Sequence, residues 1–381
     1  MAKESTSIAD VLKDIAKKHD IRIGPASEVV DETTWLTTGN LGIDYVSGAG
    51  MPIGRTVELY GPPSCGKTTA ALQTAAALQK IIIAEGRNEH ILYLDFEHAI
   101  DPEYTANLGL DIEHPSFLLA QPASMEQGAE AALKLIATGQ VRLSIWDSVA
   151  AMAPIARLEG EFDQRTAAMN KARLMAGLML QLTPLLHKHE STAIFINHLM
   201  ESVEMGARPG LPPKVTTPGG KALKYYASVR LEFRQIGNAK AKTPDVLTGE
   251  DTNQAVATVV KVKCVKNKVA TPHREAEVRV RYGRGFDNFW SALQVLLAYK
   301  AVRKEGAYYR FDERFRLPEM AEQGFGATGR VSMHGESAVL AYADAHPHWG
   351  KLIIDEAVDL IAKHAADEPL GHDETLDEDD Q

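Results

Sequence analysis

The chain has 381 residues, of which 45% are hydrophobic and 24% are charged. This composition supplies enough apolar material for a large core and excludes wholesale disorder, and the length suggests roughly two or three domains. The formal net charge is −10, and removing the eight acidic residues of the segment 367–381 leaves −2. The folded body is therefore nearly neutral, so any nucleic-acid surface on it has to be a local basic patch.

The cysteines and the apolar runs indicate the compartment. Only two cysteines occur, Cys65 and Cys264, and neither belongs to a C-x-x-C pair. A disulfide framework and a zinc–cysteine site are therefore not expected, and a reducing compartment fits best. The first residues are charged, which argues against a secretory signal, and no apolar run approaches the ~18 residues of a membrane span. We predict a cytoplasmic protein with no membrane partner.

The first predicted element is a short amphipathic helix. Ser7 and Asp10 have the spacing of a capping box, and apolar residues follow at helical spacing from Ile8 to Ile15. An extended stretch and a polar linker to about Asp31 come next. So small an apolar stripe needs a partner surface, which is either the rest of its own chain or a neighbouring subunit.

From Trp35 to about Phe286, predicted strands alternate with predicted helices. This alternation indicates βαβ units and a mainly parallel sheet. The last strands follow one another with little helix between them, so we expect an antiparallel extension of the sheet. The expected strands are Thr56–Tyr60, Ile91–Asp95, Val141–Asp147, Thr192–Asn197, Ala227–Phe233, Val256–Val265 and Glu275–Tyr282, and the expected helices include Thr68–Lys80, Met125–Ala137 and Ala172–Lys188.

After Asp287 the pattern changes and indicates a small second domain. We expect a helix over Phe289–Lys304, an aromatic hairpin around Tyr308–Phe311 and then two more helices. The acidic stretch after Ala366 is expected to be disordered and solvated.

A phosphate-binding motif lies between the first of these strands and its helix. Residues 61–68 match G-x-x-x-x-G-K-S/T in the strand–loop–helix context that the motif requires. Its backbone N–H groups and the helix N-terminus attract phosphate, Lys67 is expected to reach the β- and γ-phosphates, and the Thr68 hydroxyl to ligate Mg²⁺. Cys65 is best interpreted as a small residue at a variable loop position. The expected nucleotide-binding residues are Gly61, Pro62, Pro63, Ser64, Cys65, Gly66, Lys67, Thr68 and Thr69.

Two acids would complete a hydrolase site. Asp147 ends a predicted strand, where a carboxylate either holds the metal as a Walker-B acid does or caps the next element. A carboxylate beside the γ-phosphate can also orient or deprotonate the attacking water. The spacing after the strand Ile91–Asp95 leaves Asp95, Glu97 and His98 open for that role.

Several segments together resemble the RecA recombinase family, in the family's order from about residue 35 to residue 286. A phosphate loop alone indicates only a superfamily, whereas Gly219–Tyr226 and Lys266–Lys268 are far more specific. The C-terminal part resembles the family more loosely, around residues 306–309. The matching segments are Leu36–Asp44, Gly61–Thr68, Asp95–Pro102, Trp146–Ala151, Leu158–Glu161, Ile194–Asn197, Gly219–Arg230 and Val265–Lys268.

The resemblance implies an α/β fold with a RecA-type P-loop ATPase core, whose mainly parallel twisted sheet is flanked by helices. It implies a DNA-dependent ATPase that uses ATP and Mg²⁺, forms helical filaments of many copies on single-stranded DNA, and exchanges strands with double-stranded DNA in recombination and repair. The domains it implies are an N-terminal helix and oligomerisation linker (1–31), the ATPase core (32–286), a small α/β C-terminal domain (287–364) and a disordered acidic tail (365–381).

The resemblance also assigns residues around the nucleotide. It implies that Glu97 is the catalytic carboxylate and Asp147 the Walker-B acid that holds the metal with Thr68. Lys266 and Lys268 match lysines that reach the γ-phosphate of the neighbouring subunit. The residues implied on the adenine side are Asp101, Tyr104 and Tyr282, and for Tyr282 packing in the core remains equally open.

Two loops correspond to DNA-binding loops of the family, at about Gly160–Ala168 and Leu199–Lys221. Without the resemblance, ordinary solvated loops would be the preferred interpretation. The DNA-binding residues implied are Lys171, Arg173, Arg208, Lys214, Gly219 and Gly220.

The chain departs from the bacterial pattern at three positions. His198 stands where the family usually has glutamine as the γ-phosphate sensor. A histidine at this place resembles phage recombinases of the UvsX type. Leu180 and Met200 stand where bacterial members carry arginines, so the DNA contacts are expected to differ. The alternative function is a hexameric RecA-fold DNA motor or helicase, which shares the phosphate loop and acids but has no reason to carry Lys266–Lys268.

Overall fold

The computed structural model describes residues 7–19, 21–30, 32–160, 164–202, 214–244, 251–316, 320 and 331–365. Its internal contacts divide the chain into a small unit, Met1–Thr34, and a large unit that begins at Trp35.

The small unit contains the helix α1 (Ile8–His19) and the single turn α2 (Ala26–Val29). The Asp10 N–H donates to Ser7 Oγ at 3.2 Å, and the Ser7 hydroxyl donates to the Asp10 carboxylate at 2.6 Å. The predicted helix and its cap are therefore confirmed. Every described residue of α1 is exposed or half-buried, and Ile8 is 80% exposed.

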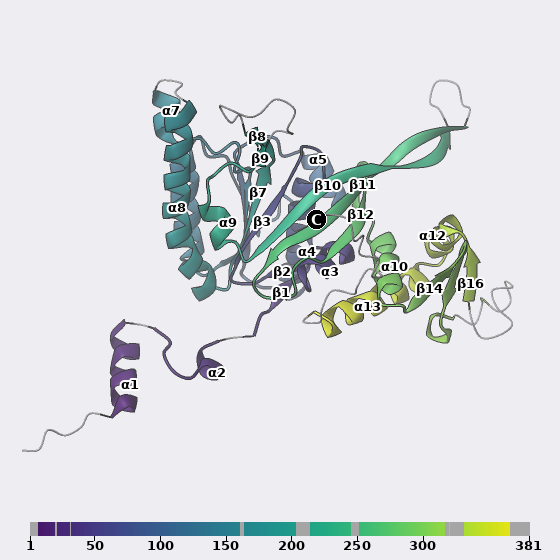
Figure 1. The fold of residues 1–381 in the computed structure, drawn as a ribbon, viewed down its shortest axis with the longest axis horizontal. Helices are drawn as coiled ribbons and strands as arrows, with labels where there is room; N and C mark the ends of the chain where they lie inside the picture. Colours follow the sequence, from purple (N-terminus) through teal and green to yellow (C-terminus); the bar gives the residue numbers. More distant parts are fainter. Residues whose placement is uncertain are drawn as a thin grey trace, which may run out of the picture. The chain divides into compact units, whose positions relative to one another are not determined.

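The large unit is built on a nine-stranded sheet in the order β13-β12-β11-β10-β3-β7-β6-β4-β5 (Figure 1). Neighbouring strands from β10 to β5 run parallel, and β10 to β13 form an antiparallel extension. Both features confirm the predicted α/β fold. The strands are β3 (Thr56–Gly61), β4 (His90–Asp95), β5 (Phe117–Ala120), β6 (Val141–Asp147), β7 (Thr192–His198), β10 (Val229–Pro244), β11 (Asp251–Asn267), β12 (Glu275–Arg281) and β13 (Gly285–Phe286).

Helices cover both faces of this sheet because successive strand residues point to opposite sides. In β6, Ile145 enters the core that contains the apolar residues of α4, whereas Trp146 enters the core that contains those of α6 and α8. Trp146 stacks on Phe195 of β7, with ring centroids 5.0 Å apart. The helices are α3 (Leu41–Ser47), α4 (Lys67–Ala84), α5 (Pro102–Asn107), α6 (Met125–Ile136), α7 (Ile155–Glu159), α8 (Gln164–Lys188) and α9 (Ala222–Tyr226).

Two short strand pairs accompany the sheet. β1 (Trp35–Leu36) pairs with β2 (Met51–Pro52), and β8 (Met200–Ser202) pairs with β9 (Lys214–Thr216). β8 and β9 lie at the two ends of the predicted second DNA loop, whose residues 203–213 lie outside the described part.

The C-terminal region combines helices with a three-stranded antiparallel sheet, as expected for a small α/β region. The predicted aromatic hairpin is confirmed, because Tyr308–Phe311 pairs with the preceding strand. Trp349 and Phe311 are buried at its centre. The elements are α10 (Asn288–Ala298), β14 (Val302–Glu305), β15 (Tyr308–Phe311), the 3-10 turn η1 (Glu313–Phe315), β16 (Val331–His334), α12 (Glu336–Ala345) and α13 (Pro347–Lys363).

The prediction of a helix over Phe289–Lys304 was wrong at the C-terminal end, because α10 ends at Ala298. Lys300 has a φ of 58°, its N–H donates to the Leu297 carbonyl at 3.0 Å, and the Ala301 N–H donates to the Leu296 carbonyl at 2.9 Å. This is the Schellman pattern, which usually places glycine where Lys300 stands. The sequence therefore carried no glycine to mark the helix end.

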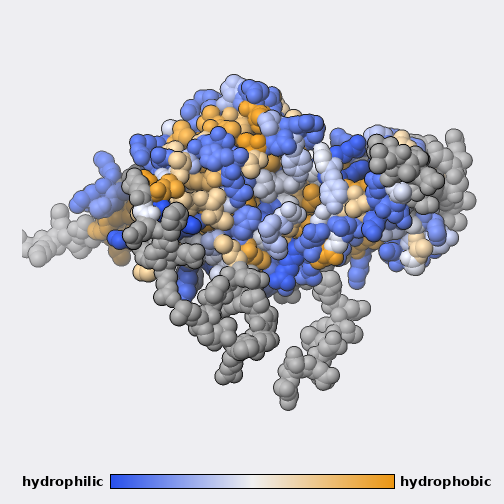
Figure 2. Space-filling view, turned by 90° about the horizontal axis from the view of Figure 1, so that it is seen from above, coloured by the Kyte–Doolittle hydropathy of each residue, from blue (hydrophilic) through white to orange (hydrophobic). Residues whose placement is uncertain are grey.

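A membrane span requires a helix of sufficient length and apolarity. Among the helices that the structure describes, none is long and apolar enough to cross a bilayer. On the face shown in Figure 2, hydrophilic side chains are interspersed with hydrophobic patches.

Candidate functional site

The parallel strands place the candidate residues at one edge of the sheet. β3, β4, β6 and β7 end at Gly61, Asp95, Asp147 and His198, and the register pairs Gly61 with His198 and Asp95 with Asp147. Ligands of open α/β sheets bind beyond the carboxyl ends of the strands. The predicted phosphate loop, acids and sensor histidine therefore meet at the expected edge.

The phosphate loop connects the last residue of β3 to the first residue of α4. Gly66 precedes the helix with a φ of 85°, and a Cβ at this position would lie 3.0 Å from Val280 Cγ2. Ser64 also has a positive φ, of 58°. Left-handed residues beside a helix N-terminus turn backbone N–H groups toward one concavity, which suits a phosphate.

Lys67 lies inside this loop and is only 4% exposed. Its ammonium donates to the Gly61 carbonyl at 3.1 Å and to the Pro62 carbonyl at 2.6 Å. Phosphate oxygens are acceptors of the same kind with more negative charge, so a bound phosphate can replace these carbonyls. Cys65 is fully buried, its thiol donates to the Pro62 carbonyl, and burial raises the thiol pKa. These features favour a packing role for Cys65.

Asp147 and Thr68 form the pair that the sequence assigned to Mg²⁺. The Thr68 hydroxyl donates to Asp147 Oδ2 at 2.9 Å, and the Tyr93 hydroxyl donates to the same oxygen at 2.7 Å. Burial raises the pKa of Asp147. A hydroxyl and a carboxylate beside a phosphate loop are hard oxygen donors, which Mg²⁺ prefers, so these residues fit the metal. Sequence reasoning missed Tyr93, which looks like one more apolar residue of a buried strand.

The structure separates the three acid candidates that follow β4. Asp95 is 2% exposed and accepts from the backbone N–H groups of Ala99 and Ile100, so it stabilises a turn. His98 is exposed, and no hydrogen bond of its side chain occurs within the described residues. Asp95 also accepts from Gln121, which follows β5, whereas in the described part of the chain only Glu97 of the three contacts Ser148 and His198, and this favours it as the catalytic carboxylate.

Glu97 Oε1 is held by two partners from other strand ends. His198 Nε2 lies 3.2 Å from it, and the Ser148 hydroxyl donates to it. The hydrogen bond with His198 lowers the pKa of Glu97 most, and the hydrogen bond from Ser148 lowers it further. Together they outweigh the effect of burial, which raises the pKa. The carboxylate is therefore ionised at neutral pH, as a group that orients or deprotonates water must be.

His198 is joined through Asn197 to the end of the second loop. The His198 N–H donates to Asn197 Oδ1 at 3.0 Å, and Asn197 Nδ2 donates to the Pro218 carbonyl at 3.1 Å and to Glu58 Oε1 at 2.9 Å. Glu58 is fully buried and pairs with Arg230. The contacts thus run from Glu97 to the residue before Gly219. Sequence reasoning missed Ser148, Asn197 and Glu58, because their roles depend on partners distant in the chain.

The predicted adenine-side residues lie on two elements. Asp101 caps α5 by accepting from the Tyr104 N–H at 3.1 Å, and the Tyr104 hydroxyl lies 2.8 Å from Thr69 Oγ1 on α4. Tyr104 therefore contacts the helix that begins with the phosphate loop. Tyr282 is 53% exposed, and its hydroxyl accepts from the Thr258 hydroxyl at 3.2 Å. The alternative of core packing for Tyr282 is wrong.

Lys266 and Lys268 lie at the end of β11 and bind the C-terminal carbonyls of α9. The Lys266 ammonium donates to the Lys224 and Tyr225 carbonyls at 2.7 and 2.9 Å, and the Lys268 ammonium donates to the Tyr225 carbonyl at 3.0 Å. Burial, and then the Lys268 charge, lower the pKa of Lys266 to about 8. Because α9 begins just after Gly219 and Gly220, these lysines contact the helix that follows the predicted DNA loop.

The predicted DNA-binding residues have different surroundings. Lys171 is 6% exposed and donates to the Ala150 carbonyl at 2.9 Å, and burial lowers its pKa to about 8. This position favours a structural role for Lys171, whereas Arg173 on the same helix is exposed. Leu180, also on α8, is 64% exposed. Arg208 and the side chain of Lys214 lie outside the described residues.

The two glycines of the second loop pack closely on neighbouring elements. Gly219 and Gly220 have φ values of 93° and 73°, and a Cβ on Gly220 would lie 2.8 Å from the Ala172 Cβ of α8. A side chain at Gly220 would therefore push the end of the loop away from α8.

Comparison with known proteins gives consistent matches over most of the chain. Residues 3–287 match the family model described as the RecA N-terminal domain. The chain is 38% identical over 369 residues to Protein RecA from Streptococcus parasanguinis, covering 97% of this chain and 90% of that protein. It is 40% identical over 308 residues to Protein RecA from Streptococcus sanguinis (strain SK36), covering 81% and 75%. It is also similar to the crystal structure of the RadB recombinase, with a TM-score of 0.46 and 20% identity over 66% of this chain and 99% of that one.

Proposed function

The chain belongs to the RecA recombinase family, and from this premise we propose that it is a DNA-dependent ATPase that forms helical filaments on single-stranded DNA. In these filaments it would pair homologous DNA and exchange strands with a duplex. The observation that supports the coupling most directly is the set of contacts from Glu97 through His198 and Asn197 to Pro218. These contacts connect the proposed hydrolytic carboxylate with the proposed DNA loop.

The proposed nucleotide chemistry uses residues of one strand edge. The loop N–H groups and Lys67 would bind the β- and γ-phosphates of ATP, and Thr68 and Asp147 would hold Mg²⁺, which when bound neutralises phosphate charge. Tyr93 also donates to Asp147 Oδ2 and would keep this oxygen hydrogen-bonded if the Thr68 hydroxyl turned toward the metal. Glu97, held by Ser148 and ionised, would orient the attacking water and accept its proton.

His198 is expected to link nucleotide state to DNA affinity. Its ring lies 3.2 Å from Glu97 Oε1, and a bound γ-phosphate would give the ring a second acceptor, so ATP should alter the contacts that run from Glu97 to Pro218. His198→Ala should weaken the dependence of DNA affinity on ATP, whereas His198→Gln, which keeps a hydrogen-bond donor, should retain it. The measurement is DNA affinity with and without ATP, with His98→Ala as the matched control. An unchanged ATP dependence in His198→Ala would contradict the sensor role.

Lys266 and Lys268 are expected to act on the nucleotide of a neighbouring protomer. The double variant Lys266→Ala/Lys268→Ala should stay folded and bind ATP, lose most DNA-stimulated hydrolysis, and inhibit wild type when mixed with it. Because Lys266 with its lowered pKa is charged below about pH 8 and neutral above it, ATP-driven assembly should weaken as the pH rises through 8.

The measurement for this pair is turnover per subunit against protein concentration. Lys134→Ala/Lys351→Ala removes two exposed lysines elsewhere and serves as the control. A wild type that remains monomeric, with turnover independent of concentration, would contradict the action across subunits.

The acidic segment 367–381 is proposed to compete with DNA for the protein's own basic loops. A tethered polyanion reaches a high effective concentration, and its effect is screened by salt and by Mg²⁺. Its deletion should tighten double-stranded DNA binding, mainly at low salt. Replacing its acids by Asn and Gln at constant length should have the same effect. Equal affinities of all three proteins across a salt titration would leave the segment only a solubility role.

The proposed function is tested by ATP hydrolysis with and without single-stranded DNA, combined with electron microscopy of the same mixtures. We expect DNA-stimulated hydrolysis and helical filaments that require ATP. Closed six-membered rings would favour the alternative, a hexameric RecA-fold motor. Hydrolysis unaffected by DNA, with no filament, would contradict the proposal.

A further inference from the structure

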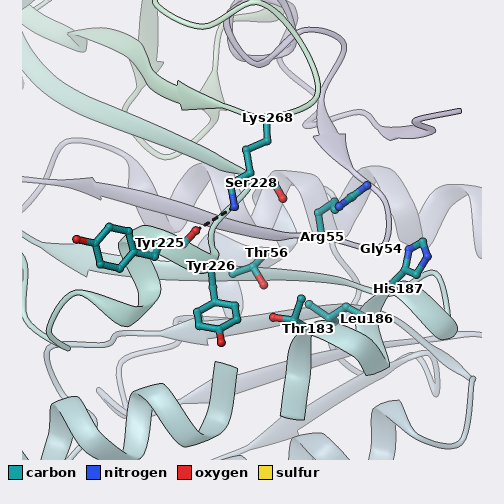
Figure 3. A pocket seen from close by; sticks show the side chains of 10 residues that line it. All are labelled: Gly54, Arg55, Thr56, Thr183, Leu186, His187, Tyr225, Tyr226, Ser228 and Lys268. Carbon is teal, nitrogen blue, oxygen red and sulfur yellow. Dashed lines mark hydrogen bonds between the residues drawn. The ribbon is translucent and has the colours of Figure 1, made fainter. Parts of the chain in front are cut away.

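A pocket of about 270 Å³ lies at the beginning of β3. Its walls come from the turn before β3, the C-terminal end of α8, the end of α9 with the residue before β10, and Lys268 (Figure 3). β3 runs from Thr56, which lines the pocket, to Gly61, where the phosphate loop begins. The pocket and the phosphate loop therefore lie at opposite ends of one strand, roughly 17 Å apart.

The described side chains that line this pocket include cations and no carboxylate. The Arg55 guanidinium has no hydrogen bond or ion pair within the described part of the chain. The Lys268 ammonium binds only the neutral Tyr225 carbonyl there. His187 adds an imidazole, whose ring N–H is a further hydrogen-bond donor. The charges of this lining are thus not neutralised by the residues around them.

Two hydroxyl groups of the lining also need partners. Thr56 is 3% exposed, and its Oγ1 is buried with no hydrogen-bond partner among the described residues. Ser228 is 4% exposed, and its hydroxyl forms no hydrogen bond to a described residue. A buried hydroxyl without a partner destabilises a fold, and a bound acceptor would remove that penalty.

We propose that this pocket binds a phosphate-type oxyanion, either free phosphate or the phosphate group of a small ester. Such an anion presents mostly acceptor oxygens, and this lining offers several donors. The guanidinium of Arg55 provides a planar set of donors that matches phosphate, and Lys268 adds a point charge. The volume is close to the lower end of small-molecule pockets, so an organic group fits beside Tyr226.

The site shares one residue, Lys268, with the proposed recombinase function. Arg55 and Thr56 take no part in the proposed nucleotide chemistry, so their variants test this site by itself. Its failure in an experiment would leave the ATPase proposal untouched, and failure of the ATPase proposal would leave this site to be tested by itself.

The experiment measures binding of inorganic phosphate by equilibrium dialysis on the full-length chain carrying Lys67→Ala, which weakens phosphate binding at the phosphate loop. We expect one phosphate bound per chain. Adding Arg55→Gln should weaken that binding by about tenfold or more, because a charge-assisted contact is lost. Adding Arg314→Gln, an exposed arginine of the C-terminal region, should leave it unchanged.

Thr56→Val separates binding from folding. Valine has the shape of threonine and removes only the unpartnered hydroxyl, so the variant should be at least as stable in phosphate-free buffer. It should gain less thermal stability from added phosphate than its parent. No phosphate bound in the Lys67→Ala chain, or binding unaffected by both Arg55→Gln and Thr56→Val, would overturn the proposal.

Two further measurements identify the ligand and locate its binding site. Glycerol phosphate that binds more tightly than inorganic phosphate would identify an ester as the occupant, and equal affinities would identify the free anion. Crystals soaked in tungstate, a phosphate analogue, should show anomalous scattering beside Arg55 and Ser228. Scattering at the phosphate loop only would overturn the assignment.

Discussion

Replacing Lys67 by alanine is expected to abolish nucleotide-dependent activity. The ammonium lies within the phosphate loop, where it binds the Gly61 and Pro62 carbonyls. Without it, the bound triphosphate lacks a buried positive charge beside it. The negative charge that develops in the transition state also lacks a hydrogen-bond donor, and such a donor contributes about 10²–10³-fold to the rate at comparable sites. The measurement is DNA-stimulated ATP hydrolysis with parallel titration of nucleotide binding.

Lys80→Ala is the matched control for this change. Lys80 is an exposed lysine on the same helix, so its removal alters the charge of α4 without reaching the loop. We expect Lys80→Ala to hydrolyse ATP as the wild type does. DNA-stimulated turnover near the wild-type level in Lys67→Ala would reject the assignment of the phosphate site.

Glu97→Gln is expected to bind ATP and DNA but to hydrolyse ATP about 10²–10⁴-fold more slowly, which is the usual contribution of a general base. The amide cannot take the proton of the attacking water. If ATP joins neighbouring protomers through Lys266 and Lys268, as proposed, its hydrolysis would release them, so this variant should remain longer in the DNA-bound filament. Single-turnover hydrolysis and DNA dissociation rates measure the two effects.

Two controls separate the chemistry of Glu97 from its contacts. Glu103→Gln changes an exposed carboxylate on α5 and should have no effect. Ser148→Ala removes one hydrogen bond to Glu97 and should slow hydrolysis less than Glu97→Gln does. If Glu97→Gln fails to bind nucleotide at all, the residue has a structural role and the catalytic assignment falls.

The pH dependence of hydrolysis gives an additional check on Glu97. Its pKa is lowered by the hydrogen bonds from His198 and Ser148, so the carboxylate stays ionised well below neutral pH. Loss of activity between pH 7 and pH 5 would therefore arise from a group other than Glu97. In His198→Ala this carboxylate loses the first of these partners, so the pKa of Glu97 should rise and its own loss of ionisation should begin at a higher pH.

The sequence alone determined the features that depend on short-range order. The phosphate loop is a continuous motif, so its position between β3 and α4 could be predicted from residues 61–68. The alternation of apolar strands and amphipathic helices likewise predicted the parallel sheet and its antiparallel extension. The end of α10 could not be predicted, because Lys300 adopts a left-handed conformation that sequence patterns assign to glycine.

Only the tertiary structure decided which of the candidate side chains meet. Asp95, Glu97 and His98 are equivalent by spacing, but Glu97 contacts Ser148 and His198, which lie 51 and 101 residues away in the chain. Lys171 and Arg173 are both cations of one helix, yet one is buried and the other exposed. Motifs specify local backbone geometry, whereas burial and pairing depend on strand order and helix packing, which bring distant residues into contact.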